Sequence, residues 1–292
     1  MRVIVLGASG LIGHKLFEKL SERFETYGTL KNKIKDYDHP FFSCHENFIE
    51  NINAHDFSSL VKKLDEINPD VILNCIGITK RKNEVNIPLE VININALLPH
   101  KLLKWAKENK KRLIHFSTDC VFNGKDGSYS ENSLTNSEDA YGRTKALGEI
   151  NHPNALTIRS SFVGRELFTN SELLEWFLSE NKKEIEGFKH AMYTGVSTIF
   201  LAKIVGDIIE YHPNLSGLKQ LSIKKSISKF DLLNIAKNSF NKKIDLIPNI
   251  NFKIDASLNG NKLRNELNYW NPSWKTMMDE LASDNKFYKK YN

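Results

Sequence analysis

The chain has few of the features that mark membrane, secreted or metal-binding proteins. No run approaches the ~20 apolar residues that cross a bilayer, and the first residues predict a strand rather than a signal peptide. Only three cysteines occur among 292 residues, Cys44, Cys75 and Cys120, and none has metal-ligand spacing. An odd count without a secretion signal indicates reduced thiols in the cytoplasm. We therefore expect a cytoplasmic protein with no metal and no membrane partner.

The chain also lacks a concentrated block of charge, internal repeats and low-complexity tracts. The net charge of +6 comes from 41 basic and 35 acidic residues that are dispersed along the sequence. This excess suits a small anionic ligand, although lysine-rich composition alone explains it equally well. We expect no nucleic-acid partner. A composition of 40% apolar and 26% charged residues is that of a soluble globular protein.

A glycine-rich turn near the start indicates a nucleotide site. Residues 2–6 form a short apolar run that predicts a buried parallel strand. The turn then places Gly7, Gly10 and Gly13 directly before an apolar-periodic helix, His14 to Glu22. Glycine at these three positions allows a tight turn, a close approach of backbone to a pyrophosphate and close packing of helix on strand. The helix N-terminus adds N–H groups that favour an anion.

Apolar strands alternate with helical patterns through the first half of the chain. Further strands are predicted at residues 24–30, 71–76, 112–117 and 155–160, and helices start at the N-cap Asp56 and at Pro88, the latter running to Lys110. Residues 31–53 are polar and irregular. This alternation predicts an α/β fold with a parallel sheet covered on both faces. Such sheets bind ligands at the carboxyl ends of their strands, where Gly7, Asn74 and Thr118 fall.

Tyr141 and Lys145 lie four residues apart on a predicted helix. Residues at this spacing share a helix face, so Lys145 can favour the ionised form of the Tyr141 phenol. A tyrosine in this setting exchanges a proton with a carbonyl or alcohol oxygen near neutral pH. The spacing alone is common in helices, and it gains weight from the nucleotide motif that precedes it.

In these motifs the sequence resembles the extended short-chain dehydrogenase/reductases, and within them the dTDP-4-dehydrorhamnose reductase group. The motifs that carry the resemblance are Gly7, Gly10 and Gly13; residues 74–77 (Asn-Cys-Ile-Gly); Asn95-Ala96; residues 117–122 (Ser-Thr-Asp-Cys-Val-Phe); and residues 141–149 (Tyr-Gly-Arg-Thr-Lys-Ala-Leu-Gly-Glu). The resemblance spans residues 1 to about 165. It implies a Rossmann-type doubly wound parallel sheet, followed by a smaller C-terminal α/β substrate-binding region.

The resemblance implies a domain division and a catalytic set. Residues 1–165 are expected to form the dinucleotide-binding domain, and residues 166–292 mainly the substrate region, with residues 190–212 returning to the first domain. The implied catalytic residues are Tyr141 as proton donor, Lys145, Thr118 on the substrate oxygen and Asn95 in a proton relay. Asp119 accompanies Thr118 in this group; an N-cap or a loop hydrogen bond explains it equally well.

The cofactor implied is a nicotinamide dinucleotide, with NADP(H) favoured and NAD(H) as the alternative. The strand at 24–30 ends in Thr29, Leu30 and Lys31, without the acidic residue that would grip a ribose 2′-hydroxyl. Lys31 could instead receive a 2′-phosphate or be a solvated loop lysine, and Asn53 stands where the family often binds adenine. The remaining residues that the resemblance assigns to the cofactor are Gly7, Ser9, Gly10, Leu11, Ile12, Gly13, Cys75, Ile76, Gly77, Tyr141 and Lys145.

The expected substrate is a nucleotide-diphosphate sugar with a keto group at ring carbon 4, either dTDP-4-dehydrorhamnose-like or a UDP-linked acetamido sugar. Reduction would serve the synthesis of a surface-polysaccharide sugar. Thr118, Cys120 and Val121 would contact the substrate, and Arg165 could grip its diphosphate bidentately. Trp176 either stacks on the base or fills the core. Near the C-terminus, Trp270 and Trp274 are expected to pack.

Other functions on the same fold stay open. A dehydratase is disfavoured because Cys120 follows Asp119, where an acid pair would be needed. An epimerase or a non-catalytic NADP-binding regulatory protein remain the alternatives, although regulators of this kind commonly lose the tyrosine or the lysine. The sequence does not decide the number of subunits, and a homodimer is the assembly considered.

Overall fold

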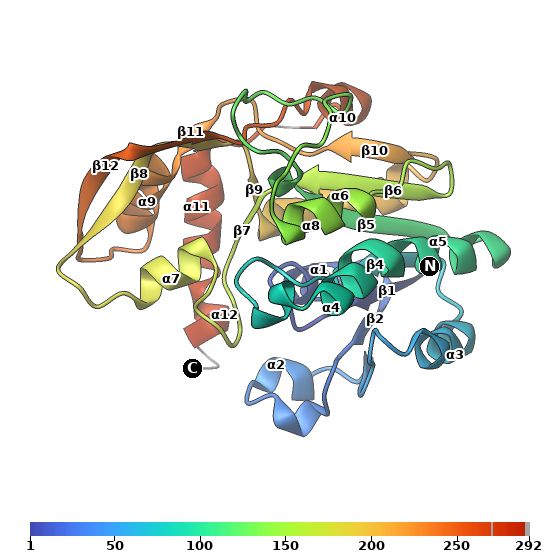
Figure 1. Ribbon diagram of the computed structural model, residues 1–292. Helices are drawn as coiled ribbons and strands as arrows, with labels where there is room; N and C mark the ends of the chain where they lie inside the picture. Colours follow the sequence, from blue (N-terminus) through green and yellow to red (C-terminus); the bar gives the residue numbers. More distant parts are fainter. Residues whose placement is uncertain (270, 290–292) are drawn as a thin grey trace.

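The computed structural model describes residues 1–269 and 271–289 and contains a seven-stranded central sheet. Its strands are β1 (Arg2–Leu6), β2 (Glu25–Thr29), β3 (Phe48–Ile49), β4 (Val71–Asn74), β5 (Arg112–Thr118), β6 (Ala155–Ser160) and β10 (Gly217–Gln220). They lie in the order β10-β6-β5-β4-β1-β2-β3, and every pairing is parallel. Chain order reverses between β1 and β4, so the predicted doubly wound α/β fold is confirmed (Figure 1).

Helices cover both faces of this sheet, because successive strand residues point to opposite sides. Val3 and Val5 join one core cluster with residues of α1 (Gly13–Ser21) and α8 (Thr198–Tyr211). Ile4 and Leu6 join another with residues of α3 (Phe57–Ile67) and α5 (Leu98–Glu108). Burial on both sides explains why β1 is a continuous apolar run instead of an alternating one.

Several element ends follow directly from local sequence. Asp56 is the N-cap of α3, as predicted, and its carboxylate accepts a hydrogen bond from the Ser59 N–H at 3.0 Å. The predicted strands at 2–6 and 155–160 have the bounds of β1 and β6. The irregular segment 31–53 contains short elements, the 3₁₀ turn η1 (Ile34–Asp36), α2 (Pro40–Ser43) and β3. Its three buried phenylalanines, Phe41, Phe42 and Phe48, anchor it to the core.

The long helix expected from Pro88 to Lys110 is divided into three parts. After the 3₁₀ turn η2 (Asn83–Asn86), α4 (Pro88–Val91) leads into a π-helical turn, η3 (Ile92–Leu97), and then into α5. The side chain of Asn95, inside the π turn, is bonded to neighbouring elements instead of solvent. Sequence periodicity cannot reveal such a turn, because one extra residue does not interrupt the helical pattern.

The second half of the chain builds a smaller layer beside the central sheet. Its three-stranded sheet has the order β11-β8-β12, with β8 (Glu184–Tyr193) between β11 (Ile227–Ser228) and β12 (Asp245–Asp255). Besides α8, the helices of this half are α7 (Leu173–Ser179), α9 (Lys229–Ser239), α10 (Asn261–Leu267), α11 (Trp274–Ser283) and α12 (Asn285–Lys289). Figure 1 shows the three-stranded sheet with α7, α9 and α11 to the left of the central sheet, whereas α10 lies at the upper right, next to β10. A small pair, β7 (Phe162–Val163) and β9 (Val196–Ser197), connects the layers.

Two segments of the second half belong to the central layer. β10 extends the central sheet beside β6, and α8 packs on α1, where Arg23 bonds Asp207 at 2.9 Å. Residues 198–211, which form α8, thus lie against the first layer, as β10 does, whereas residues 190–193 belong to β8 of the three-stranded sheet. Trp274 is buried against Tyr193, whereas Trp270 lies outside the described residues.

Candidate active site

The glycine turn after β1 forms the first wall of the candidate site. Gly7 has φ +82°, a left-handed conformation that favours glycine. A Cβ on Gly13 would lie 2.1 Å from the Gly7 carbonyl oxygen, so only glycine allows this close approach. Within the described part of the chain, the backbone N–H groups of Ser9, Leu11 and Ile12 donate no hydrogen bond to the protein. Unpartnered N–H groups at the start of α1 fit an anionic ligand such as a pyrophosphate.

The loop after β4 forms the second wall. The Cys75 N–H donates to the Leu6 carbonyl at 3.0 Å, and the side chain of Ile76 lies directly against Gly7. Burial raises the pKa of the Cys75 thiol, which keeps it protonated. The predicted cofactor residues of the two loops, Gly7 and residues 75–77, therefore lie together.

Asn95 joins this loop to the helix that carries the predicted catalytic pair, α6 (Ala140–Leu147). Its amide accepts from the Ile78 N–H at 2.9 Å and donates to the Ile78 carbonyl at 2.9 Å. A third bond, 3.4 Å long, reaches the Thr144 hydroxyl on α6. Asn95 is buried, and its amide oxygen and amide nitrogen both have partners. In this structure it holds the β4 loop against α6.

Tyr141 and Thr118 meet at the carboxyl end of β5. Burial, the largest effect, raises the pKa of the Tyr141 phenol well above its ordinary value, Cys120 adds to this rise, and the nearby Thr118 side chain acts against it. The Thr118 hydroxyl also donates to the Asp119 carboxylate at 3.1 Å. Burial raises the pKa of Asp119 in turn, against the opposing charges of Lys229 and Lys80. The phenol is therefore held in its protonated, proton-donating form.

Lys145 is buried beside the cofactor loops. Its ammonium group donates to the Phe116 carbonyl at 2.6 Å, and burial lowers its pKa to about 8 while Glu149 and Cys75 raise it. The strongest influences on the Tyr141 pKa are burial, Cys120 and Thr118, and Lys145 is not among them. The predicted direct effect of Lys145 on the pKa of the phenol is therefore not among the main influences in this structure. Lys145 lies close to Cys75 instead.

Sequence reasoning missed Lys80, which lies over the catalytic helix. Its ammonium group pairs with the Asp139 carboxylate at 2.6 Å and lies 6.0 Å from the centre of the Tyr141 ring. Asp139 is the N-cap of α6 and accepts from the Gly142 N–H at 2.7 Å. The basic run at residues 80–82, directly after a cofactor loop, was the signal available in the sequence.

A pocket of about 570 Å³ opens between α7, α9 and the three-stranded sheet. We call it the cationic pocket, because its three cations, Arg81, Lys182 and Lys229, outnumber the two carboxylates, those of Glu184 and Glu186, that also line it. Trp176 and Phe188 contribute aromatic walls. Arg81 bonds Glu172 at 3.1 Å, and Lys229 is close enough to lower the pKa of Asp119. The pocket therefore adjoins the predicted catalytic residues and has the size of small-molecule sites.

Some predicted site residues have other contacts. The guanidinium of Arg165 is buried and bonded to both carboxylate oxygens of Glu175 and to Asn285, so those donors are used within the protein. Val121 is fully buried in a small apolar cluster with Phe122. Cys120 is partly buried next to the phenol. A contact of Arg165 or the Val121 side chain with a substrate would require these arrangements to open.

Among the residues predicted to bind the adenosine end of the cofactor, one is bonded within the protein and others are exposed. Thr29 is buried, and its hydroxyl accepts from the Gly7 N–H at 3.0 Å, so it shapes the glycine turn. Lys31 and Asn53 are exposed at the edge of the sheet. The first acid after β2, Asp36, accepts from the Lys33 N–H at 3.2 Å. Of this group, Lys31 is the side chain placed to meet an anionic ligand.

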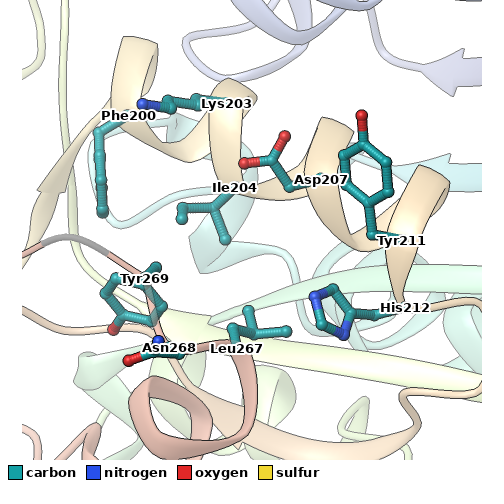
Figure 2. A pocket seen from close by; sticks show the side chains of 9 residues that line it. All are labelled: Phe200, Lys203, Ile204, Asp207, Tyr211, His212, Leu267, Asn268 and Tyr269. Carbon is teal, nitrogen blue, oxygen red and sulfur yellow. The ribbon is translucent and has the colours of Figure 1, made fainter.

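Figure 2 shows another pocket, of about 430 Å³, between α8 and the end of α10. Lys203, Asp207 and Tyr211 face Leu267 and Tyr269 across it. No predicted site residue lines this pocket. In addition, none of the helices in the described ranges combines the length and apolarity needed to span a membrane.

Comparisons with known proteins give the family. Named relatives include the "Probable low-salt glycan biosynthesis reductase Agl14" of Haloferax volcanii, which is 31% identical over 56% of this chain and 54% of its own length. The dTDP-4-dehydrorhamnose reductase of Mycolicibacterium smegmatis is 27% identical over 56% of the chain and 46% of its own. The matched regions thus span about half of these two relatives.

Structural comparison supports the same fold. A crystal structure of dTDP-4-dehydrorhamnose reductase from Bacillus anthracis, in complex with NADP, superposes with a TM-score of 0.79 at 20% identity, covering 100% of this chain and 99% of that one. The family described as "RmlD substrate binding domain" matches residues 1–283. The resemblance read from the sequence is therefore confirmed, and the chain belongs to this family.

Proposed function

We propose that this protein is an NAD(P)H-dependent reductase of a 4-keto-6-deoxy nucleotide sugar, acting in the synthesis of a surface-polysaccharide sugar. One observation carries the proposal: the Tyr141 phenol and the Thr118 side chain lie close together at the end of β5, beside the loops that meet at Gly7. The named reductases among the relatives support the reaction class. The specific sugar remains part of the proposal.

The glycine turn and the start of α1 would hold a nicotinamide dinucleotide. The free N–H groups of Ser9, Leu11 and Ile12 suit its pyrophosphate. Lys31, without an acidic neighbour at the end of β2, favours a ribose 2′-phosphate, so we propose NADP(H) first and NAD(H) second. When bound, this cofactor supplies the hydride for the reduction.

The chain's own residues handle the proton. Burial keeps the Tyr141 phenol protonated at neutral pH. Its proton can therefore pass to the ketone oxygen as that oxygen gains negative charge. The Thr118 hydroxyl orients the same oxygen. Lys145, still charged below a pKa of about 8, would bind the nicotinamide ribose. Asn95 holds the β4 loop and α6 in register for this transfer.

The cationic pocket is the proposed site of the nucleotide diphosphate. Arg81, Lys182 and Lys229 offer positive charge, and Trp176 offers a ring for the base. The nucleotide is dTDP or UDP. A UDP-linked acetamido sugar is as good a candidate as a dTDP-linked sugar. A homodimer and a cytoplasmic location stay predictions.

A second candidate is a non-catalytic regulatory protein. The relative named methionine adenosyltransferase 2 subunit beta, from Danio rerio, is 25% identical over 82% of this chain and 74% of its own length, a longer match than the reductases give. The retained Tyr141, Lys145 and Thr118 favour the enzyme. An epimerase, the other alternative, would be purified with NAD bound.

One experiment separates these functions. Purified protein is incubated with a panel of dTDP- and UDP-linked 4-keto sugars and with NADPH or NADH, and the absorbance of the reduced cofactor is followed. Oxidation that requires a keto sugar supports the reductase. Tight cofactor binding without turnover of any sugar would support the regulatory protein, and bound NAD at purification the epimerase.

A further inference from the structure

His14 is a buried histidine that contacts the glycine turn from the side of α1. Its Nδ1 lies 2.8 Å from the Gly10 carbonyl oxygen, and its Nε2 lies 2.8 Å from the Tyr288 hydroxyl on α12. Both side chains are almost completely buried. Neither has a role in the proton transfer proposed above. Residues 274 positions apart thus meet beneath the pyrophosphate loop.

The two contacts fix the protonation of this imidazole. Because a carbonyl oxygen only accepts, Nδ1 carries the hydrogen and donates to Gly10. Nε2 then has a free lone pair, which accepts from the Tyr288 O–H. Burial and the charges of Lys15, His39 and Arg165 lower the His14 pKa to about 3, with only the Gly10 bond acting against them. The ring is therefore neutral near pH 7, with one tautomer selected by the Gly10 carbonyl.

Tyr288 is itself held between two cations. The Arg165 guanidinium lies 4.6 Å from the centre of its ring and the Lys15 ammonium 5.2 Å. Lys15 is fully buried and bonds the Asp284 carboxylate at 2.6 Å. Arg165 also bonds Asn285. The Arg165 guanidinium, which the sequence analysis assigned to the substrate diphosphate, is therefore occupied by protein groups.

The direction of the Gly10 carbonyl matters for an anion. The Gly10 oxygen accepts from the His14 N–H at 3.1 Å and from Nδ1. A carbonyl oxygen turned toward a pyrophosphate would repel it, whereas a carbonyl bonded on the helix side leaves the neighbouring N–H groups available.

We propose that His14 and Tyr288 are positioning residues of the cofactor site: Tyr288 holds His14, and His14 holds the Gly10 carbonyl so that the glycine turn is preformed for the pyrophosphate. This inference rests on the proposed function, because it requires a dinucleotide in the turn. It makes cofactor affinity depend on α12, an element remote from the turn in sequence.

The test is Tyr288→Phe in the full chain, with affinity for NADPH measured by isothermal titration calorimetry. Loss of the hydroxyl leaves Nε2 buried without a donor, and we expect the Kd to rise about tenfold, the scale of one such bond. The KM for NADPH should rise equally, while kcat at saturating cofactor stays within about twofold of the original. A role in stability alone would not produce this separation of KM from kcat.

Tyr269→Phe is the matched control. The Tyr269 hydroxyl donates to the Ser222 carbonyl at 3.1 Å in the pocket of Figure 2, remote from the turn in its contacts. It should lower the melting temperature to a similar extent without changing the Kd. His14→Leu, which removes the acceptor of the Tyr288 hydroxyl, should make a further Tyr288→Phe change silent.

The outcomes are distinguishable. An unchanged Kd in Tyr288→Phe, with tight NADPH binding by the original protein, overturns the positioning role and leaves the proposed function intact. A Kd that rises equally in Tyr269→Phe also overturns it, because the effect would then be one of general stability. Failure of the original protein to bind either NADPH or NADH overturns both proposals.

Discussion

At the scale of single residues, burial decides the chemistry of the tyrosine. The Tyr141 pKa is raised by its surroundings, and the Thr118 hydroxyl reduces this rise only in part. A phenol with a raised pKa is protonated near neutral pH, so it carries the proton that a developing alkoxide needs and cannot accept one until that proton has left. The arrangement therefore suits reduction of a ketone better than oxidation of an alcohol at that pH.

Tyr141→Phe should abolish this donor while leaving the glycine turn unchanged. We expect turnover of the keto sugar to fall by a factor of about 10² to 10⁴, the usual contribution of a positioned acid. Cofactor affinity, measured by calorimetry, should change little. Near-normal turnover with the best substrate of the panel would remove Tyr141 from the proposed mechanism.

Lys145 gives the reaction a pH dependence on the alkaline side. Its pKa is lowered to about 8, mainly by burial, so it is charged below that pH and neutral above it. If the ammonium group is the active form, kcat/KM should fall about tenfold per pH unit above pH 8. A rate profile from pH 6 to 10 measures this.

Lys145→Arg provides the comparison for that profile. Guanidinium stays charged across this pH range, so the fall near pH 8 should be absent even though the rate is lower throughout. A fall at the same pH in both proteins would assign the titration to another group.

At the scale of elements, the N-cap of α6 connects stability to catalysis. The Asp139 carboxylate, in the turn that presents Tyr141, accepts from the Gly142 N–H and pairs with Lys80 of the loop after β4. Asp139→Ala should cost about 1 kcal/mol of stability, as N-caps do. It should also lower kcat at least tenfold, because a small displacement of the phenol disturbs the proton transfer.

Asp56→Ala is the control for this effect. Asp56 caps α3 by the same kind of bond, 3.0 Å long, but α3 carries no predicted site residue. Urea denaturation should show a similar loss of stability in both variants, and only Asp139→Ala should lose activity. Equal activities would show that the α6 cap is purely structural.

Elements were predictable from the sequence where the signal is local. The runs at β1 and β6 are apolar and rich in β-branched residues, so periodicity located both strands. The glycine turn and the Tyr141–Lys145 pair are recognisable from the spacing of their residues in the sequence. The role of Lys80 could not be predicted, because its partner Asp139 comes from a different loop and sequence periodicity carries no information about such pairs.

At the scale of the whole molecule, Arg165 shows the same limit. Its residue type suits a diphosphate, but the structure supplies Glu175 and Asn285, the latter 120 positions away, as its partners. Long-range partners of this kind depend on the packing of α7 and α12 around β7. The predicted substrate half was less accurate than the first half for this reason.

Arg165→Met should destabilise the whole protein. It leaves the Glu175 carboxylate buried without its cation, which we expect to cost about 3 kcal/mol in the free energy of unfolding. The double variant with Glu175→Leu should recover most of that loss, because it removes the unpaired charge. Urea denaturation of both proteins measures this, and a double variant no more stable than the single one would contradict the explanation.

The π turn at residues 92–97 has a consequence for comparing this chain with its relatives. Such a turn accommodates one residue more than an α turn, and each residue of an α-helix rotates the side-chain direction by about 100°. A relative that is shorter by one residue here would still form a continuous helix, but the amide equivalent to Asn95 would face elsewhere. Alignments should therefore place any gap inside this turn, and a shorter relative would need a different residue to clasp the β4 loop.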